Sequence, residues 1–344
     1  MRRLLYFIGF SIATTCAHAQ SSVTIFGIMD SGVYFQNRTG NGGSGVSALD
    51  GAWAPSVWGM TGTEDLGNGY HAVFKLGSGI STTSGGFGNS NGNLFGWNTY
   101  VGVDGPYGNI HAGVQFSPFF LSIFGDDARG GPQYASNVSV YFDRFGGTGL
   151  FESNSLIYTS PTIAGFEASV EYAFGNVPGS PAAGHHYSAA LNYRLGPFSA
   201  TLAYFQANAP QTSQTAFIGQ NIGVGYKVGP IEVHASYTKY RNELLANCND
   251  VDVYAGGLAW LLTSSFSFNA GVYYSRDANV SANKSLLVGA GSQYVLSKRT
   301  TLYTQLGVVN NKGEMRSEIA SNAPNFVPGL GTTTGVNIGI THKF

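Results

Sequence analysis

The residue types that carry enzyme or metal chemistry are present, but not at the spacings that such chemistry needs. Gly40-Asn41-Gly42-Gly43-Ser44-Gly45 matches the G-x-G-x-x-G pattern that cradles dinucleotide phosphates. No helix is expected after it, so we interpret it as a flexible loop. His185-His186 has no spaced Cys, His or carboxylate partner for a metal. No G-x-S-x-G elbow or Ser/His/Asp set can be placed, and we expect no enzyme, metal or cofactor chemistry.

A long link between residues 117 and 151 carries the most suggestive charges. Asp126 and Asp127 are followed closely by Arg129. Such groups attract or repel ions, and rings of carboxylates in particular favour cations. More than about thirty residues are too many merely to reverse the chain direction. Two interpretations stay open: the link folds back and narrows a channel, or it is a surface loop with solvated charges.

The composition excludes most soluble proteins. Charged residues make up 10% of the 344-residue chain, against roughly 25% in soluble domains. Tyr and Phe are abundant, with 20 and 23 residues. No stretch of about 20 uninterrupted apolar residues follows the N-terminus, so membrane-spanning helices do not explain this composition. A lipid-facing β-barrel explains it, because only every second residue of each strand has to be apolar.

Residues 1–19 have the features of a cleavable signal peptide. Two arginines are followed by an apolar stretch up to Thr15 and by the small-x-small cleavage site Ala17-His18-Ala19. A lipoprotein signal at Cys16 is the alternative, but the residues before the cysteine lack the expected leucine and small side chains. We therefore expect export through the periplasm and a mature chain of residues 20–344.

Cleavage leaves one cysteine, Cys248, so no disulfide framework is expected. It also removes two of 17 basic residues, against 18 acidic ones, which gives a mature net charge of about −3. That balance argues against a nucleic-acid partner.

Apolar and polar residues alternate along the mature chain. In residues 266–274 the even positions are apolar and the odd ones mostly small or polar. This is the pattern of a strand between lipid and water. Residues 231–238 and 166–172 share it, so the three segments are expected to be strands of one design.

Short turns alternate with longer links between the expected strands. The turns lie at 64–69, 104–108, 160–165, 195–197, 228–230, 262–265 and 296–299, and the links near 38–52, 81–92, 117–151, 177–184, 207–216, 242–250, 277–283 and 312–333. These fifteen connections predict an all-β, antiparallel transmembrane barrel of about 16 strands, with short periplasmic turns and long extracellular loops. Roughly sixteen strands enclose a water-filled channel, whereas about eight would pack solid.

Four segments carry a family resemblance. They are the mature start at 21–33, the hairpin at 58–67, the strand at 100–103 and the terminal His342-Lys343-Phe344. Together they resemble the Gram-negative general porins, especially the β-proteobacterial branch. The resemblance implies an outer-membrane homotrimer among lipid and lipopolysaccharide, with a third loop folded into each pore and small hydrophilic solutes diffusing through it. It also implies that Phe344 is the signal for the barrel-assembly machinery.

Porins of this kind usually place basic residues on the barrel wall opposite an acidic constriction loop. This chain departs from that pattern at five wall positions, which carry Val57, Thr61, Trp97, Val114 and Thr159. The basic half of the constriction is therefore expected to be missing.

The charges expected in the lumen are Asp126, Asp127 and Arg129 on the loop, with Lys75, Glu167, Glu171, Arg194 and Lys227 on the wall. A narrow low-dielectric channel magnifies the effect of such charges. The sequence thus predicts a pore that is weakly cation-selective or tuned to neutral solutes. Alternatively, the loop residues Arg129 and Arg144 refill the lumen with positive charge.

Two further functions stay open. A substrate-preferring channel for sugars or aromatic compounds would use Trp97 and Phe116 as a stacking surface. A surface adhesin or structural barrel would instead have a closed pore.

Overall fold

The computed structural model describes residues 22–144 and 150–344, so the predicted signal peptide at 1–19 lies outside the described residues. The strands are β1 (Ser22–Gln36), β2 (Gly45–Asp50), β3 (Val57–Gly67), β4 (Tyr70–Gly79), β5 (Thr99–Gly105), β6 (Gly108–Gln115), β7 (Glu152–Thr159), β8 (Phe166–Ala173), β9 (His186–Leu195), β10 (Phe198–Asn208), β11 (Thr215–Val228), β12 (Ile231–Asn242), β13 (Asp250–Leu261), β14 (Phe266–Asp277), β15 (Lys284–Val295), β16 (Thr300–Lys312) and β17 (Gly331–Lys343). The described helices are α1 (Pro118–Gly125), α2 (Asn137–Arg144) and the short 3-10 helix η1 (Pro324–Phe326).

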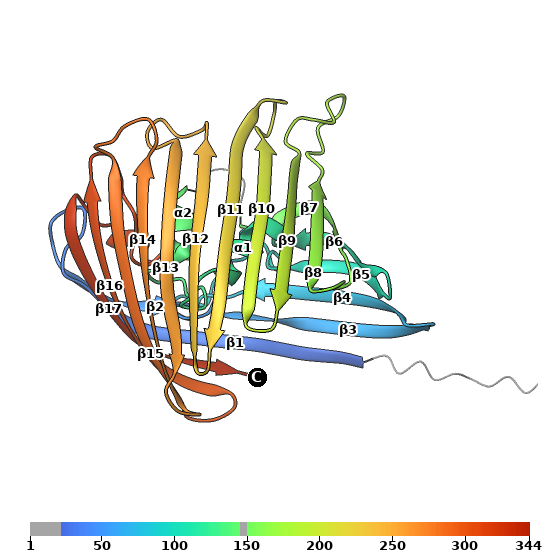
Figure 1. Ribbon diagram of the computed structural model, residues 1–344, viewed down its shortest axis with the longest axis horizontal. Helices are drawn as coiled ribbons and strands as arrows, with labels where there is room; N and C mark the ends of the chain where they lie inside the picture. The colour runs from blue at the N-terminus through green and yellow to red at the C-terminus, as the bar shows by residue number, and fades with distance from the viewer. Residues whose placement is uncertain (1–21, 145–149) are drawn as a thin grey trace, which may run out of the picture.

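All the described strands form one closed antiparallel sheet (Figure 1). Both β2 and β3 pair with β1, at its two ends, so together they fill one place in the wall and the barrel has 16 positions. The first and last strands also pair, and closure ends with two hydrogen bonds of 3.1 and 3.0 Å between the main chains of Gly27 and Phe344. The predicted sixteen-stranded barrel is confirmed.

The connections fall where the alternation of turns and links predicts them, except that the first predicted link, at 38–52, contains the strand β2. Each of the seven short turns joins two neighbouring strands at one end of the barrel, and the eight longer links lie at the other end (Figure 1). In several turns a residue has positive φ, for example Gly196 at 56° and Gly229 at 56°. Glycine adopts this conformation without steric cost, which fixes these tight reversals.

Side chains alternate between an apolar outer face and a polar inner face. On β14, Phe268 and Val272 are exposed while Asn269 and Ser275 are buried. The outer face is exposed in the isolated chain and matches the apolar band that a barrel presents to lipid. Neither α1 nor α2 is long and apolar enough to cross a membrane.

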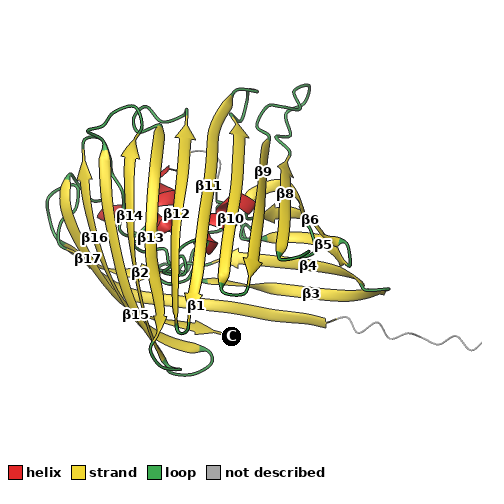
Figure 2. Cartoon of the chain, in the orientation of Figure 1, coloured by secondary structure: helices red, strands yellow, loops and turns green. Residues whose placement is uncertain are grey.

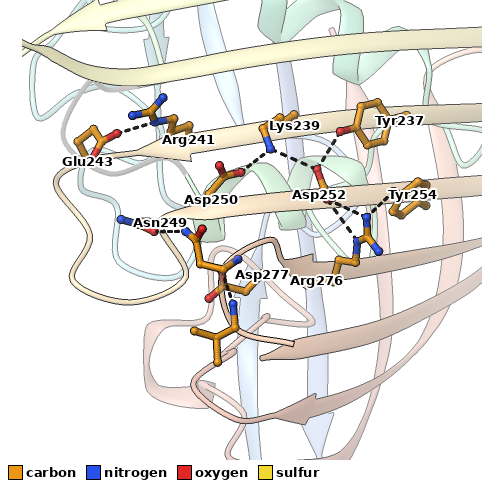
Figure 3. Close-up of polar contacts among 12 residues, drawn as sticks. Tyr237, Lys239, Arg241, Glu243, Asn249, Asp250, Asp252, Tyr254, Arg276 and Asp277 are labelled. Atoms are coloured by element: carbon orange, nitrogen blue, oxygen red, sulfur yellow. Dashed lines mark hydrogen bonds and ion pairs between the residues drawn. The ribbon is translucent and has the colours of Figure 1, made fainter. Parts of the chain in front are cut away.

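A charged cluster marks the edge of this outer band at the long-loop ends of β12, β13 and β14 (Figure 3). The Lys239 ammonium lies 2.6 Å from Asp250 and 3.6 Å from Asp252. Asp252 also lies 3.2 Å from the Arg276 guanidinium and accepts a 2.8 Å hydrogen bond from Tyr237. Charges on a lipid-facing wall are costly at the membrane centre and nearly free at its edge. The cluster therefore places the end of the lipid-facing band at these residues.

The link between β6 and β7 enters the barrel, as the sequence allowed. Figure 2 shows its two helices inside the ring of strands. The helix α1 contacts β8, β9, β10 and β11, and also α2. We call residues 116–151 the inner loop.

Candidate functional site

The first part of the inner loop is a helix because its sequence supplies both a start and an apolar surface. The Ser117 hydroxyl accepts a 3.2 Å hydrogen bond from the Phe120 backbone N–H, and Pro118 occupies the first turn. Both features favour helix initiation. Phe119 and Ile123 are buried against the barrel wall, where Phe119 lies 6.0 Å from the Phe205 ring. Apolar burial thus holds α1 to one side of the lumen.

Two glycines on the inner face of β11 leave the space in which this helix contacts the wall. A Cβ at Gly219 would stand 2.3 Å from the Phe119 ring, and one at Gly223 would stand 2.1 Å from the Asp126 carboxyl carbon. Real side chains cannot approach so closely. The helix therefore reaches the wall only because these two positions lack a side chain.

Arg129 ties the next part of the loop to the opposite wall. Its guanidinium donates to Asn269 of β14 at 2.9 Å and to Gln305 of β16 at 3.0 Å. It also donates to the carbonyls of Tyr134, at 2.6 Å, and of Ala135. With 1% of its surface exposed, Arg129 serves the loop's position and contributes no free charge to the lumen. Arg144 is also buried, with 5% exposed, so the alternative in which Arg129 and Arg144 refill the lumen is wrong.

Asp127 is the partner of this arginine within the loop. Its carboxylate accepts hydrogen bonds from the Arg129 backbone at 2.8 Å, the Asn137 backbone at 2.6 Å and the Tyr273 hydroxyl at 2.9 Å. Burial raises the pKa of Asp127, and these donors and the positive charge of Arg129 oppose that rise. Only 4% of Asp127 is exposed.

Asp126 also faces the wall. It accepts a 2.6 Å hydrogen bond from the Asn221 side chain of β11 and is 7% exposed. The expectation that Asp126 and Asp127 present an acidic edge to the lumen therefore needs correction. Both carboxylates are used to dock the loop, because buried polar groups require partners that the inner wall supplies.

The surface that the loop offers to the lumen is apolar. Within residues 117–144, the only exposed side chains are Leu121, at 51%, and Phe124, at 45%. Sequence reasoning missed both, because it followed the charges. The signal was the run Pro118–Gly125, which is apolar on all sides and so cannot bury every side chain against one wall.

The predicted wall residues fall in different places. The register puts Val57 and Thr61 on the inner face of β3, with Val57 almost fully buried and Thr61 half-buried. Thr159 shares the inner face with Ser169, 3.1 Å away, next to the 160–165 turn.

Val114 does not face the constriction. It pairs with Thr99 and follows Ile110 and Ala112 on the outer face of β6. The prediction for this residue is wrong by one position, because a shift of one residue exchanges the two faces of a strand.

Trp97 lies on the inner side next to Lys75 of β4. The Lys75 ammonium is 4.7 Å from the centre of the Trp97 ring and 5.3 Å from that of Phe26. Cations are attracted to aromatic faces at such distances. Lys75 is thus half-covered by rings rather than free in the lumen.

The other predicted lumen charges gather in a cavity of about 640 Å³ at the short-turn end of the barrel. Glu167, Arg194, Lys227, Glu232 and His234 line it together with Asp126. Opposite charges are mixed here, so no single sign dominates the lining.

Glu171 belongs elsewhere. Only 4% of it is exposed, and it lies beside Glu152 and Tyr141 at the side of the inner loop. Glu152 in turn is 2.5 Å from His186. The prediction that Glu171 adds charge to the lumen is wrong, because the loop covers it.

The pore charge near Asp126 is expected to depend on pH. Burial raises the pKa of Asp126 to about 6, so the carboxyl is mostly neutral at pH 5 and mostly ionised at pH 7. Raising the pH should therefore shift the reversal potential in a KCl gradient towards cation preference. The Asp126→Asn variant should show a smaller shift between pH 5 and 7 than the wild type, because it removes this carboxyl from the cavity. An unchanged shift in the variant would contradict this assignment.

No group of three or more metal-ligating side chains occurs in residues 22–144 or 150–344. Cys248 is a free, buried thiol in the link between β12 and β13. Burial raises the pKa of this thiol and makes it a weak nucleophile.

Phe344 closes the barrel at its C-terminus. Its ring covers Gly27, where a Cβ would come within 2.1 Å of the ring. The residue is half-exposed on the outer face. It is therefore accessible at the seam between the first and last strands.

Comparisons with known proteins agree with this architecture. The family model described as "Gram-negative porin" matches residues 9–314. The chain is 26% identical to "Outer membrane porin protein 32" of Delftia acidovorans over 357 residues, covering 100% of both chains. It is 28% identical to "Major outer membrane protein P.IB" of Neisseria gonorrhoeae, covering 92% of this chain and 96% of the relative.

Solved structures show the same fold. The structure "Anion-selective porin from Comamonas acidovorans" matches with a TM-score of 0.79 and 24% identity, over 94% of this chain and 100% of that one. The relatives are outer-membrane porins of Gram-negative bacteria, and the barrel described above is the architecture that such proteins insert into that membrane. This chain belongs to the Gram-negative porin family and is an outer-membrane porin.

Proposed function

We propose that this porin is a passive diffusion channel whose constriction is uncharged and which prefers small neutral solutes over ions of either sign. The observation that supports it is the exposed surface of the inner loop, where Leu121 and Phe124 replace a charged edge. The carboxylates of Asp126 and Asp127 face the wall instead. Small ions and hydrophilic solutes pass through the remaining lumen without a strong transverse field.

Cation preference depended mainly on loop carboxylates that face the lumen. Asp127 is buried in the loop, and Asp126 is 7% exposed at the edge of the mixed-charge cavity, so only a weak contribution that depends on pH remains. Anion preference has little more support. The porin of similar fold from Comamonas acidovorans is described as anion-selective, but this chain has Val57 and Thr61 where porins of this kind usually carry arginines. Lys75 is the basic residue closest to them on the inner wall, paired across the strands with Thr61. Near-balanced permeability follows from this arrangement.

The test is the reversal potential of the purified protein in a planar bilayer under a KCl gradient. We expect a value close to zero at pH 7 and a stable open conductance. A potential near the full Nernst value for either ion would contradict the uncharged constriction. The absence of any conductance would instead favour the adhesin or structural barrel.

Restoring one basic wall residue should produce anion preference. Thr61 is half-buried on the inner face, so Thr61→Arg places a guanidinium in the lumen without disturbing a fully buried position. A fixed charge in a narrow low-dielectric channel is felt strongly by passing ions. The reversal potential should move towards that of chloride. Thr63→Arg, an exposed inner-face position nearer the short-turn end, is the matched control and should move it less.

The remaining expectations for the mature protein are proposals as well. Residues 1–19 are removed as a signal peptide, and the barrel assembles as a homotrimer in lipid and lipopolysaccharide. The exposed Phe344 at the seam supports its role in recognition by the barrel-assembly machinery. The N-terminal residue of the mature protein and native electrophoresis of unheated samples test the first two points.

A further inference from the structure

An aromatic cavity opens onto the lumen beside the inner loop, distinct from the charged cavity at the short-turn end. Its volume is about 180 Å³. Phe116, Phe120 and Phe124 of the loop line one side, and Trp97 and Pro55 line the other. Phe124 is about half exposed, so solutes in the lumen can reach the cavity. Exposed apolar side chains gathered in a concave site are typical of a binding pocket.

The aromatic rings that line this cavity pack against one another, so their positions are fixed without a ligand. Phe116 stacks on Phe120 with 5.0 Å between ring centres, and meets Trp97 edge-on at 6.0 Å. Phe151 packs on Phe116 at 4.7 Å. Aromatic rings prefer such offset-stacked and edge-to-face geometries, and the exposed faces that remain favour another flat ring.

The size of the cavity selects a single ring. An apolar protein cavity of about 150 Å³ binds benzene, so about 180 Å³ accommodates one six-membered ring with a small substituent. Two amides, Asn89 and Gln133, also line the cavity, with a weak 3.4 Å hydrogen bond between them. A hydroxyl on the ring can replace that weak contact with a better one.

We propose that this cavity binds single-ring aromatic solutes with one polar substituent, of the phenol class, as they pass through the pore. The proposal rests on the channel function above and gives it a preferred solute class. The solute ring packs against Trp97 and the half-exposed Phe124, and the hydroxyl bonds to Asn89 or Gln133. Hydrophilic solutes pass the same point without being held.

Single-channel recording in KCl with phenol added as the probe tests this site. In the wild type, phenol should reduce the open-channel current in a concentration-dependent, saturable way. Phe124→Ser removes one wall of the cavity at a half-exposed position, so the fold should be kept. It should raise the half-blocking concentration about two- to tenfold, the worth of one aromatic contact.

Phe87→Ser is the matched control, because Phe87 is an exposed phenylalanine in the link between β4 and β5 and does not line the cavity. It should leave the block unchanged. Equal block in the two variants, or no block in a conducting wild type, would overturn the proposal. Equal block by cyclohexanol would also overturn it, because a puckered ring cannot stack. A wild type that carries no current would instead overturn the channel function itself.

Discussion

The Arg129→Met variant is expected to have a larger and noisier single-channel conductance than the wild type. Arg129 joins the inner loop to both β14 and β16 through buried hydrogen bonds. Methionine fills much of its volume but donates none of them, so Asn269 and Gln305 lose this donor. Asp127 keeps the hydrogen bond from the backbone of residue 129 but loses the nearby positive charge. Breaking a buried charged contact costs about 3–5 kcal/mol. The free energy that favours the docked loop should fall by a similar amount, because Arg129 and its wall partners all lie inside the barrel.

Conductance and limited chymotrypsin digestion measure this release. A loosened loop should be cut faster within residues 117–144, while the strands stay resistant. Arg194→Met is the matched control, because this substitution makes the same change in net charge. Arg194 is an exposed arginine that lines the charged cavity in the lumen. It should shift ion preference slightly and leave digestion unchanged. Normal digestion of the Arg129 variant would show that apolar packing of α1 alone holds the loop.

The barrel could be predicted almost completely from the sequence, because the signals for its strands and turns lie in neighbouring residues. A strand between lipid and water must alternate, and a tight turn must use glycine, proline or small polar residues, so both features are written in neighbouring residues. The strand at 266–274 and the turn at 228–230 illustrate each kind of signal. The entry of the long 117–151 link into the barrel was one of two open interpretations, because its length allowed both.

The lining of the constriction could not be predicted in the same way, because it depends on contacts between distant segments. Asp126 and Asp127 are charged in the sequence, yet Asn221 and Tyr273 bind them to the wall. These partners lie about a hundred residues or more along the chain, and no local pattern links them. The inward glycines of β11 were the missed signal. A strand that carries glycine where its inner face should be polar leaves room for another part of the chain.

The Gly219→Val variant is expected to have a lower conductance than the wild type, because Gly219 is where α1 contacts the wall. The new Cβ would meet the Phe119 ring at 2.3 Å, so helix and wall cannot keep their present distance. The Arg129 contacts still hold the following segment. The helix is therefore displaced towards the lumen rather than released. Overpacking of this kind costs about 1–3 kcal/mol. This is small beside the free energy of unfolding of a closed barrel, so the fold should be kept.

A matched substitution separates this effect from the general cost of replacing a strand glycine. Gly256 lies on the outer face of β13, where the nearest atom to an added Cβ is 3.7 Å away, so Gly256→Val should leave the conductance unchanged. Adding Phe119→Ala to Gly219→Val removes the colliding ring and should restore part of the current. Such a rescue requires that the two residues act through one contact. If Gly219→Val conducts like the wild type, or if the second substitution restores nothing, α1 is not held at this glycine and its position must be set by Arg129 alone.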